Sequence, residues 1–162
     1  MKNIIWLGPV VFLIHDLEEV FWTLPWIEKN RHLFENTRFE RVIEAMGYQP
    51  AKFGLVVALI TILYGIVSYF ATRRLQAGLS MNLYVSTLLI LFVNVFTHAG
   101  QTVLLGMYTP GVVTAVLVVL PYTLLAYRTL KARNLLTRTT WKTSPFMSVG
   151  MLVVIFGLMI VV

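Results

Sequence analysis

Five long runs of mostly apolar residues constrain the fold of this chain more than any other feature. Each run is between 18 and 26 residues long, and they cover 4–24, 53–72, 81–106, 110–128 and 145–162. A helix needs about 20 apolar residues to cross about 30 Å of hydrocarbon. Backbone polar groups in lipid must be satisfied within the segment, which favours helices. The sequence therefore predicts one all-α domain over 1–162, a polytopic membrane bundle of about five transmembrane helices.

The composition agrees with this class and excludes others. Hydrophobic residues make up 58% of the chain and charged residues 12%, whereas soluble domains have roughly 45–50% and 25%. The absence of cysteine excludes disulfides and cysteine-ligated metals. The net charge of +6 comes from Lys and Arg in short loops between apolar runs, without a basic face. No nucleic-acid partner is expected.

The distribution of charge predicts the orientation in the cytoplasmic membrane. With five spans, the N-terminus and the 73–80 and 129–144 loops share one side. That side carries eight basic residues and no acid: Lys2, Arg73, Arg74, Arg128, Lys131, Arg133, Arg138 and Lys142. Such an excess of Lys and Arg marks the cytoplasmic side. We expect the N-terminus inside and the C-terminus outside.

The polar segment 25–52 contains the pattern of a short amphipathic helix. Thr37 and Glu40 fit a capping box, and the apolar residues that follow recur at helical spacing up to Gly47. We expect this interfacial helix, over 37–47, to lie at the membrane surface above the bundle.

The first run carries a compact ionisable cluster, His15-Asp16-Leu17-Glu18-Glu19. A secretory signal would instead continue to a small-residue cleavage site, so we interpret the run as a retained helix. At 100° per residue, His15, Glu18 and Glu19 share one face and Asp16 points elsewhere. Ionisable side chains within a span are costly, so they pair, become neutral or bind a cation.

Two further polar groups occur in the third and fourth runs. Asn94, His98 and Gln101 lie at i, i+4 and i+7 on one helix face. A turn at 108–111 places Tyr108 at the mouth of run four and Thr114 one turn inside it. For Pro110 and Gly111 we interpret the pattern as turn chemistry alone.

Depth connects the three groups. In the predicted topology, residues 15–19 lie roughly 7–14 Å below the outer end of run one, and residues 98–101 roughly 7–12 Å below that of run three. Thr114 lies roughly 6 Å inside run four, on the same side. Three separate segments thus bring polar residues to one depth, which predicts a functional site.

These motifs resemble the HXXEE family of small integral membrane proteins. The resemblance rests on His15-x-x-Glu18-Glu19, Asn94-x-x-x-His98-x-x-Gln101 and Tyr108-x-Pro110-Gly111-x-x-Thr114, in this order. It covers runs one to four. It implies that these polar residues are functional: His15, Glu18, Glu19, Asn94, His98, Gln101, Tyr108 and Thr114. It does not supply a substrate.

Our main hypothesis is a membrane-embedded enzyme of hydrolase, isomerase or cyclase type. Its substrate would be a lipid-like or isoprenoid-like hydrophobic molecule. In a metal-dependent version, zinc or iron is held by His15, His98 and either Glu18 or Glu19. The other glutamate acts as base, while Asn94, Gln101, Tyr108 and Thr114 contact the substrate or orient the ligands.

Three alternatives stay open. Without a metal, a buried neutral glutamate could donate a proton while His98 accepts one, which is general acid/base catalysis. The same cluster could bind or transport a small molecule, a cation or protons, with a membrane lipid as partner. Because the five spans show no inverted repeat, transport by alternating access would need a homodimer. Finally, the cluster could only hold helices together.

Overall fold

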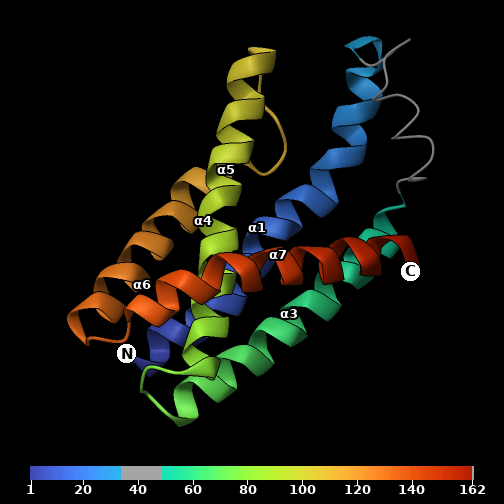
Figure 1. Cartoon of the computed structure of the whole chain (residues 1–162). Coiled ribbons are helices and arrows are strands. Elements are labelled where there is room, and N and C mark those ends of the chain that lie inside the picture. Colours follow the sequence, from blue (N-terminus) through green and yellow to red (C-terminus); the bar gives the residue numbers. More distant parts are fainter. Residues whose placement is uncertain (34–48, 162) are drawn as a thin grey trace.

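The computed structural model describes residues 1–33 and 49–161, and this part of the chain is helical (Figure 1). The helices are α1 (Lys2–Lys29), α3 (Pro50–Arg73), α4 (Leu79–Leu105), α5 (Val112–Thr114), α6 (Leu120–Ala132) and α7 (Arg138–Val161). A short 3-10 helix, η1, covers Arg31–Leu33, and a π-helical segment, η2, covers Ala115–Val119. The prediction of an all-α bundle is confirmed. The expected interfacial helix over 37–47 lies outside the described residues.

Four helical segments are long and apolar enough to cross a membrane: Pro50–Arg73, Leu79–Leu105, Val112–Ala132 and Arg138–Leu158. They correspond to the second to fifth apolar runs, so the chain fits an integral membrane protein. The first run forms the 28-residue helix α1, which is not among the four. Its ionisable cluster explains this, because charged groups lower the hydropathy of the helix. A fifth span stays a prediction.

The helices extend beyond most of the apolar runs. Helix α7 begins at Arg138, seven residues before the predicted start, and contains Pro145 in its interior. Apolar runs mark the part of a helix that suits lipid, whereas helical hydrogen bonding continues into the polar flanks. Run four is one continuous stretch, α5–η2–α6, which begins at Val112 after the Gly111 turn.

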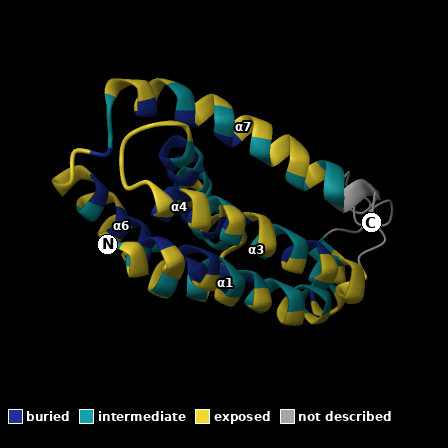
Figure 2. Ribbon diagram, turned by 90° about the horizontal axis from the view of Figure 1, so that it is seen from below, coloured by how far each residue is buried: buried dark blue, intermediate teal, exposed yellow. Residues whose placement is uncertain are grey.

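The core lies where α1, α4 and α6 meet, as the buried residues in Figure 2 show. Tyr84 and Tyr122 share a hydrogen bond of 2.7 Å, and the Tyr122 hydroxyl donates to the carbonyl of Ile4 at 3.1 Å. These bonds tie the three helices together at the end of the bundle where the N-terminus lies. The α3–α4 and α6–α7 connections are at the same end in Figure 1.

Helix α7 runs along the outside of this core and is buried only where it meets α4 (Figure 2). Ser148 donates to the carbonyl of Ser86 at 3.1 Å, and Ser144 to that of Asn82 at 3.4 Å. Small residues at these positions let the two backbones approach closely. The α4–α5 turn lies at the opposite end of the bundle from the N-terminus. The polar residues of α1 and α4 that the sequence singled out lie toward that same end.

Candidate functional site

The site is built from one helix face of α1, one of α4 and the start of α5. His15 is fully buried and His98 is 7% exposed, with their ring centroids 4.9 Å apart at an angle of 86°. Glu19 reaches both rings: its Oε1 lies 2.8 Å from His98 Nε2 and 3.7 Å from His15 Nε2. Two histidines and one carboxylate therefore meet from two helices.

The second ring nitrogen of His15 is fixed by a hydrogen-bonded chain. Thr114 Oγ1 lies 2.6 Å from Glu18 Oε2 and 2.9 Å from His15 Nδ1. An ionised carboxylate only accepts, so the Thr114 hydroxyl donates to Glu18 and His15 Nδ1–H donates to Thr114. In the neutral ring this leaves a lone pair on Nε2, where the Asn94 amide donates at 2.8 Å.

Glu18 anchors the α4–α5 connection to α1. It accepts the backbone N–H of Thr114 at 2.9 Å and the hydroxyl of Tyr108 at 2.7 Å, in addition to the Thr114 hydroxyl. Partial burial and the hydrogen bond to Glu18 raise the pKa of the Tyr108 hydroxyl, so it remains a donor. The two adjacent glutamates therefore have separate partners: Glu19 contacts the histidines, and Glu18 contacts Thr114 and Tyr108.

Gly111 has a larger role than the turn chemistry that the sequence indicated. Its φ of +89° is left-handed, as a turn requires. A Cβ at this position would clash with His98 Cε1 and lie 3.0 Å from Glu19 Oε1. Only glycine lets the backbone of the turn pass this close to the two side chains.

The structure brings together seven of the eight residues singled out by the sequence. Gln101 is the exception: it is exposed and makes no hydrogen bond with the described part of the chain. It continues the row of Asn94 and His98, but α4 leaves the bundle toward its C-terminal end, where Val103 and Leu104 are also exposed.

Sequence reasoning did not single out Trp26 as a residue of the site. The Trp26 indole N–H donates to the Tyr108 carbonyl at 2.7 Å and so holds the same turn from the next part of α1. Trp26 follows Glu19 by seven residues and therefore lies on the same helix face. That spacing was the available signal.

The geometry of His15, Glu19 and His98 suits a metal ion. One ligand atom from each of them lies within 4.8 Å of the others. Ligands at about 2.0–2.1 Å in a tetrahedral zinc site are roughly 3.3 Å apart, so small side-chain shifts would close the set. His98 Nδ1 is also buried without a hydrogen-bond partner in the described structure. These residues could hold a metal.

Comparisons with known proteins give a family and no activity. No curated protein and no solved structure matches the chain. The family model described as "Protein of unknown function with HXXEE motif" matches residues 6–126. This range contains α1 from residue 6 onward, α3, α4, the Gly111 turn and every residue of the site. The chain therefore belongs to the HXXEE family, as its three motifs predicted.

Proposed function

We propose that this protein is a membrane enzyme in which His15, Glu19 and His98 hold a zinc or iron ion that acts on a lipid-like substrate. The observation that carries the proposal is the meeting of these three ligand atoms within 4.8 Å. Two histidines and a glutamate are a known ligand set of catalytic zinc sites, and two histidines with a carboxylate also suit non-haem iron. With three protein ligands, such an ion keeps a position open and polarises a carbonyl or phosphoryl oxygen.

The surroundings of His15 support a ligand role. Histidines that bind metals usually donate their other ring N–H to an acceptor, which fixes the tautomer. Here Nδ1–H donates to Thr114, which in turn donates to Glu18. His15 Nε2 and Glu19 Oε1 both present lone pairs 3.7 Å apart, an arrangement that a cation stabilises.

This proposal gives the two glutamates different roles. Glu19 is the carboxylate ligand, while Glu18 is a positioning residue that acts on His15 through Thr114. A cation at His15 Nε2 would replace the hydrogen bond from Asn94 and leave that amide available to a substrate. Asn94 therefore is the residue that we expect to contact the substrate next to the metal.

Metal analysis of the purified full chain tests the proposal. We expect about one zinc or iron ion per chain after purification in mild detergent without chelator. The ion should be lost in His15→Ala, His98→Ala and Glu19→Gln, and retained in His32→Ala. His32 is the third histidine of the chain and lies exposed in η1, so it is a matched control.

Glu18→Gln separates ligand from positioning residue. We expect this variant to keep the metal with an affinity roughly 10–100-fold lower, the usual effect of losing a partner of a metal ligand. A folded wild type that takes up no metal even after addition of zinc or ferrous iron would overturn the proposal. The search would then turn to proton transfer by a neutral glutamate, or to cation transport measured in liposomes.

A further inference from the structure

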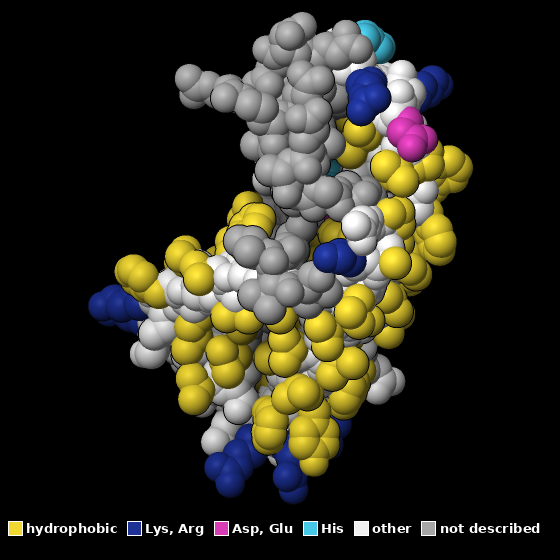
Figure 3. Space-filling view, turned by 90° about the vertical axis from the view of Figure 1, so that its right-hand side faces the viewer, with side chains coloured by type: hydrophobic (Ala, Val, Ile, Leu, Met, Phe, Trp, Pro, Cys, Tyr) yellow, Lys and Arg dark blue, Asp and Glu magenta, His cyan; other side chains and the backbone are white. Residues whose placement is uncertain are grey.

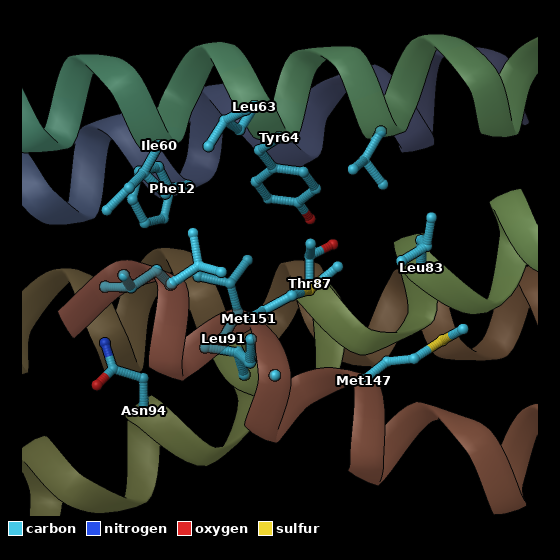
Figure 4. A pocket seen from close by; sticks show the side chains of 15 residues that line it. Phe12, Ile60, Leu63, Tyr64, Leu83, Thr87, Leu91, Asn94, Met147 and Met151 are labelled. Carbon is cyan, nitrogen blue, oxygen red and sulfur yellow. The ribbon is translucent and has the colours of Figure 1, made fainter. Parts of the chain in front are cut away.

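A large apolar pocket lies beside the site and is not used by the proposed metal centre. It has a volume of about 400 Å³ and is bounded by α3, α4 and α7, with Phe12 of α1 at its wall. Ligand pockets usually have about 300–1,000 Å³. Figure 4 shows Ile60, Leu63 and Tyr64 on the α3 side, and Thr87, Leu91 and Met151 across from them.

The pocket and the site meet at Asn94. This side chain lines the pocket and donates to His15 Nε2 at 2.8 Å. It lies at one end of the lining, while Leu83 and Met147 lie toward the other end (Figure 4). Apart from Asn94, Tyr64 and Thr87, the pocket is lined by apolar residues and Gly150. One end of the pocket therefore adjoins the histidines through Asn94, and the lining suits hydrocarbon.

The length of the pocket suits an extended hydrocarbon chain. Leu83 and Asn94 are eleven residues apart on α4, or about 16 Å along the helix. A cavity of this length with an apolar lining matches one extended hydrocarbon chain lying along α4.

The pocket opens sideways between α3 and α7. Leu63 of α3 and Val154 of α7 both line it, and they are 47% and 55% exposed. Figure 3 shows one face of the molecule, on which hydrophobic side chains cover much of the lower half and several Lys and Arg side chains lie at the lower end. In a membrane, a lateral opening on this apolar surface faces lipid tails, so a chain can enter without crossing water.

From these observations we infer that the pocket binds the single hydrocarbon chain of a lipid whose polar end lies at the His15–Glu19–His98 cluster. The hydrocarbon chain of this lipid runs along α4 from Asn94 toward Leu83. A methylene group takes up a volume of ~30 Å³, similar to that of one water molecule in the liquid. The pocket therefore holds roughly a dozen carbons. The inference deepens the proposed function, on which it rests for the identity of the head-group site.

A photoactivatable fatty acid tests the pocket directly. The probe is palmitic acid with a diazirine in its chain, added to the full protein in liposomes of a two-chain phosphatidylcholine. We expect saturable labelling at about one adduct per chain, as for a single specific pocket. Peptide mapping should place the adducts on the facing walls of α3, α4 and α7. Unlabelled single-chain lipids should compete increasingly well up to roughly a dozen carbons, and a sterol should not compete.

Two glycines of α7 give a matched pair of variants. Gly150 lines the pocket and Gly157 does not, and an added Cβ meets nothing within 4 Å at either position. Gly150→Trp fills the pocket, so we expect it to reduce labelling at least about tenfold. Gly157→Trp should leave labelling unchanged. Labelling that never saturates, spreads over all exposed apolar faces or is equal in the two variants would show ordinary surrounding lipid and overturn the inference.

The metal content of the same samples keeps the two proposals distinguishable. Gly150→Trp touches none of the three metal ligands, so it should retain its metal while losing the adduct. Saturable labelling without metal would refute the metal centre and leave the chain pocket. Metal without saturable labelling would refute the hydrocarbon pocket and leave the metal centre.

Discussion

The role of each residue in this site depends on the side chains and backbone groups that it contacts on neighbouring segments. Glu18 and Glu19 are neighbours on α1, yet Glu18 accepts three hydrogen bonds from Thr114 and Tyr108, whereas Glu19 meets two histidines. Adjacent helical residues point about 100° apart, so each faces a different neighbouring segment. A carboxylate with several fixed donors is held in place, which suits Glu18 to orient His15 rather than to react.

Gly111→Ala tests the close approach of the turn at the scale of one residue. The new Cβ would clash with His98 Cε1, and the left-handed φ of +89° adds backbone strain. We expect loss of the bound metal and a destabilisation of at least about 2 kcal/mol, from roughly 1–2 kcal/mol of strain plus the displacement of His98. Metal analysis and thermal unfolding in detergent measure the two effects.

Gly106→Ala is the control for this substitution. Gly106 also has a left-handed φ, +64°, but an added Cβ would meet nothing within 4 Å. It should cost only the strain of about 1–2 kcal/mol and keep the metal. Equal metal loss in both variants would show that backbone strain, and not contact with His98, accounts for the effect.

At the scale of elements, two contacts between segments determine the geometry of the site and of the pocket. The α4–α5 turn is held on α1 by Glu18 and by the Trp26 indole, which fixes Thr114 next to His15. Helix α7 is held on α4 by Ser144 and Ser148. A π-helical segment follows directly after Thr114, next to the contact of the α4–α5 turn with α1. Such irregular turns are frequent at functional sites.

Ser148→Leu tests the close packing of α7 on α4. Ser148 is 7% exposed against α4, so a larger side chain would push α7 away, at a cost of about 1–3 kcal/mol for overpacking. We expect a lower midpoint of thermal unfolding and weaker labelling by the photoactivatable fatty acid, because the α7 wall of the pocket moves. The metal content should stay unchanged.

Val149→Leu is the matched control, since Val149 is the next residue and is 61% exposed. It should change neither the unfolding midpoint nor the labelling. If Ser148→Leu behaved in the same way, α7 would not be fixed by close packing on α4.

At the scale of the whole molecule, the described structure separates a basic end from a polar site. The N-terminus and the 74–78 and 133–137 connections lie at one end in Figure 1, and their flanks carry the basic residues that predict the cytoplasmic side. The α4–α5 turn lies at the other end. We therefore propose five spans with the site in the outer half of the membrane, α1 included.

Single cysteines test this topology, and the absence of native cysteine makes the background clean. We expect Gln76→Cys to react with a membrane-impermeant maleimide only after cells are permeabilised. Leu104→Cys should react on intact cells, because Leu104 is the last residue but one of α4, at the predicted outer end of the span, and is 86% exposed. Labelling of Gln76→Cys on intact cells would reverse the orientation, and labelling of both would mean that the chain does not cross the membrane as proposed.

Much of the fold followed from patterns that are local in sequence. Apolar runs located four helices that are long and apolar enough to cross a membrane, because the length of a run and its polarity are local properties. Helical spacing also placed His15, Glu18 and Glu19 on one face of α1, and Asn94 and His98 on one face of α4. The family assignment followed from the same motifs and is confirmed.

The sequence by itself thus determined the class of the molecule and singled out seven of the residues that meet in its candidate site. The tertiary structure decided their partners: it separated Glu18 from Glu19, left Gln101 outside and brought Gly111 against His98. It also created the pocket between α3 and α7. Periodicity fixes where a side chain points on its own helix, but contacts and cavities depend on the distances between helices that are far apart in the chain, and those distances are set by packing.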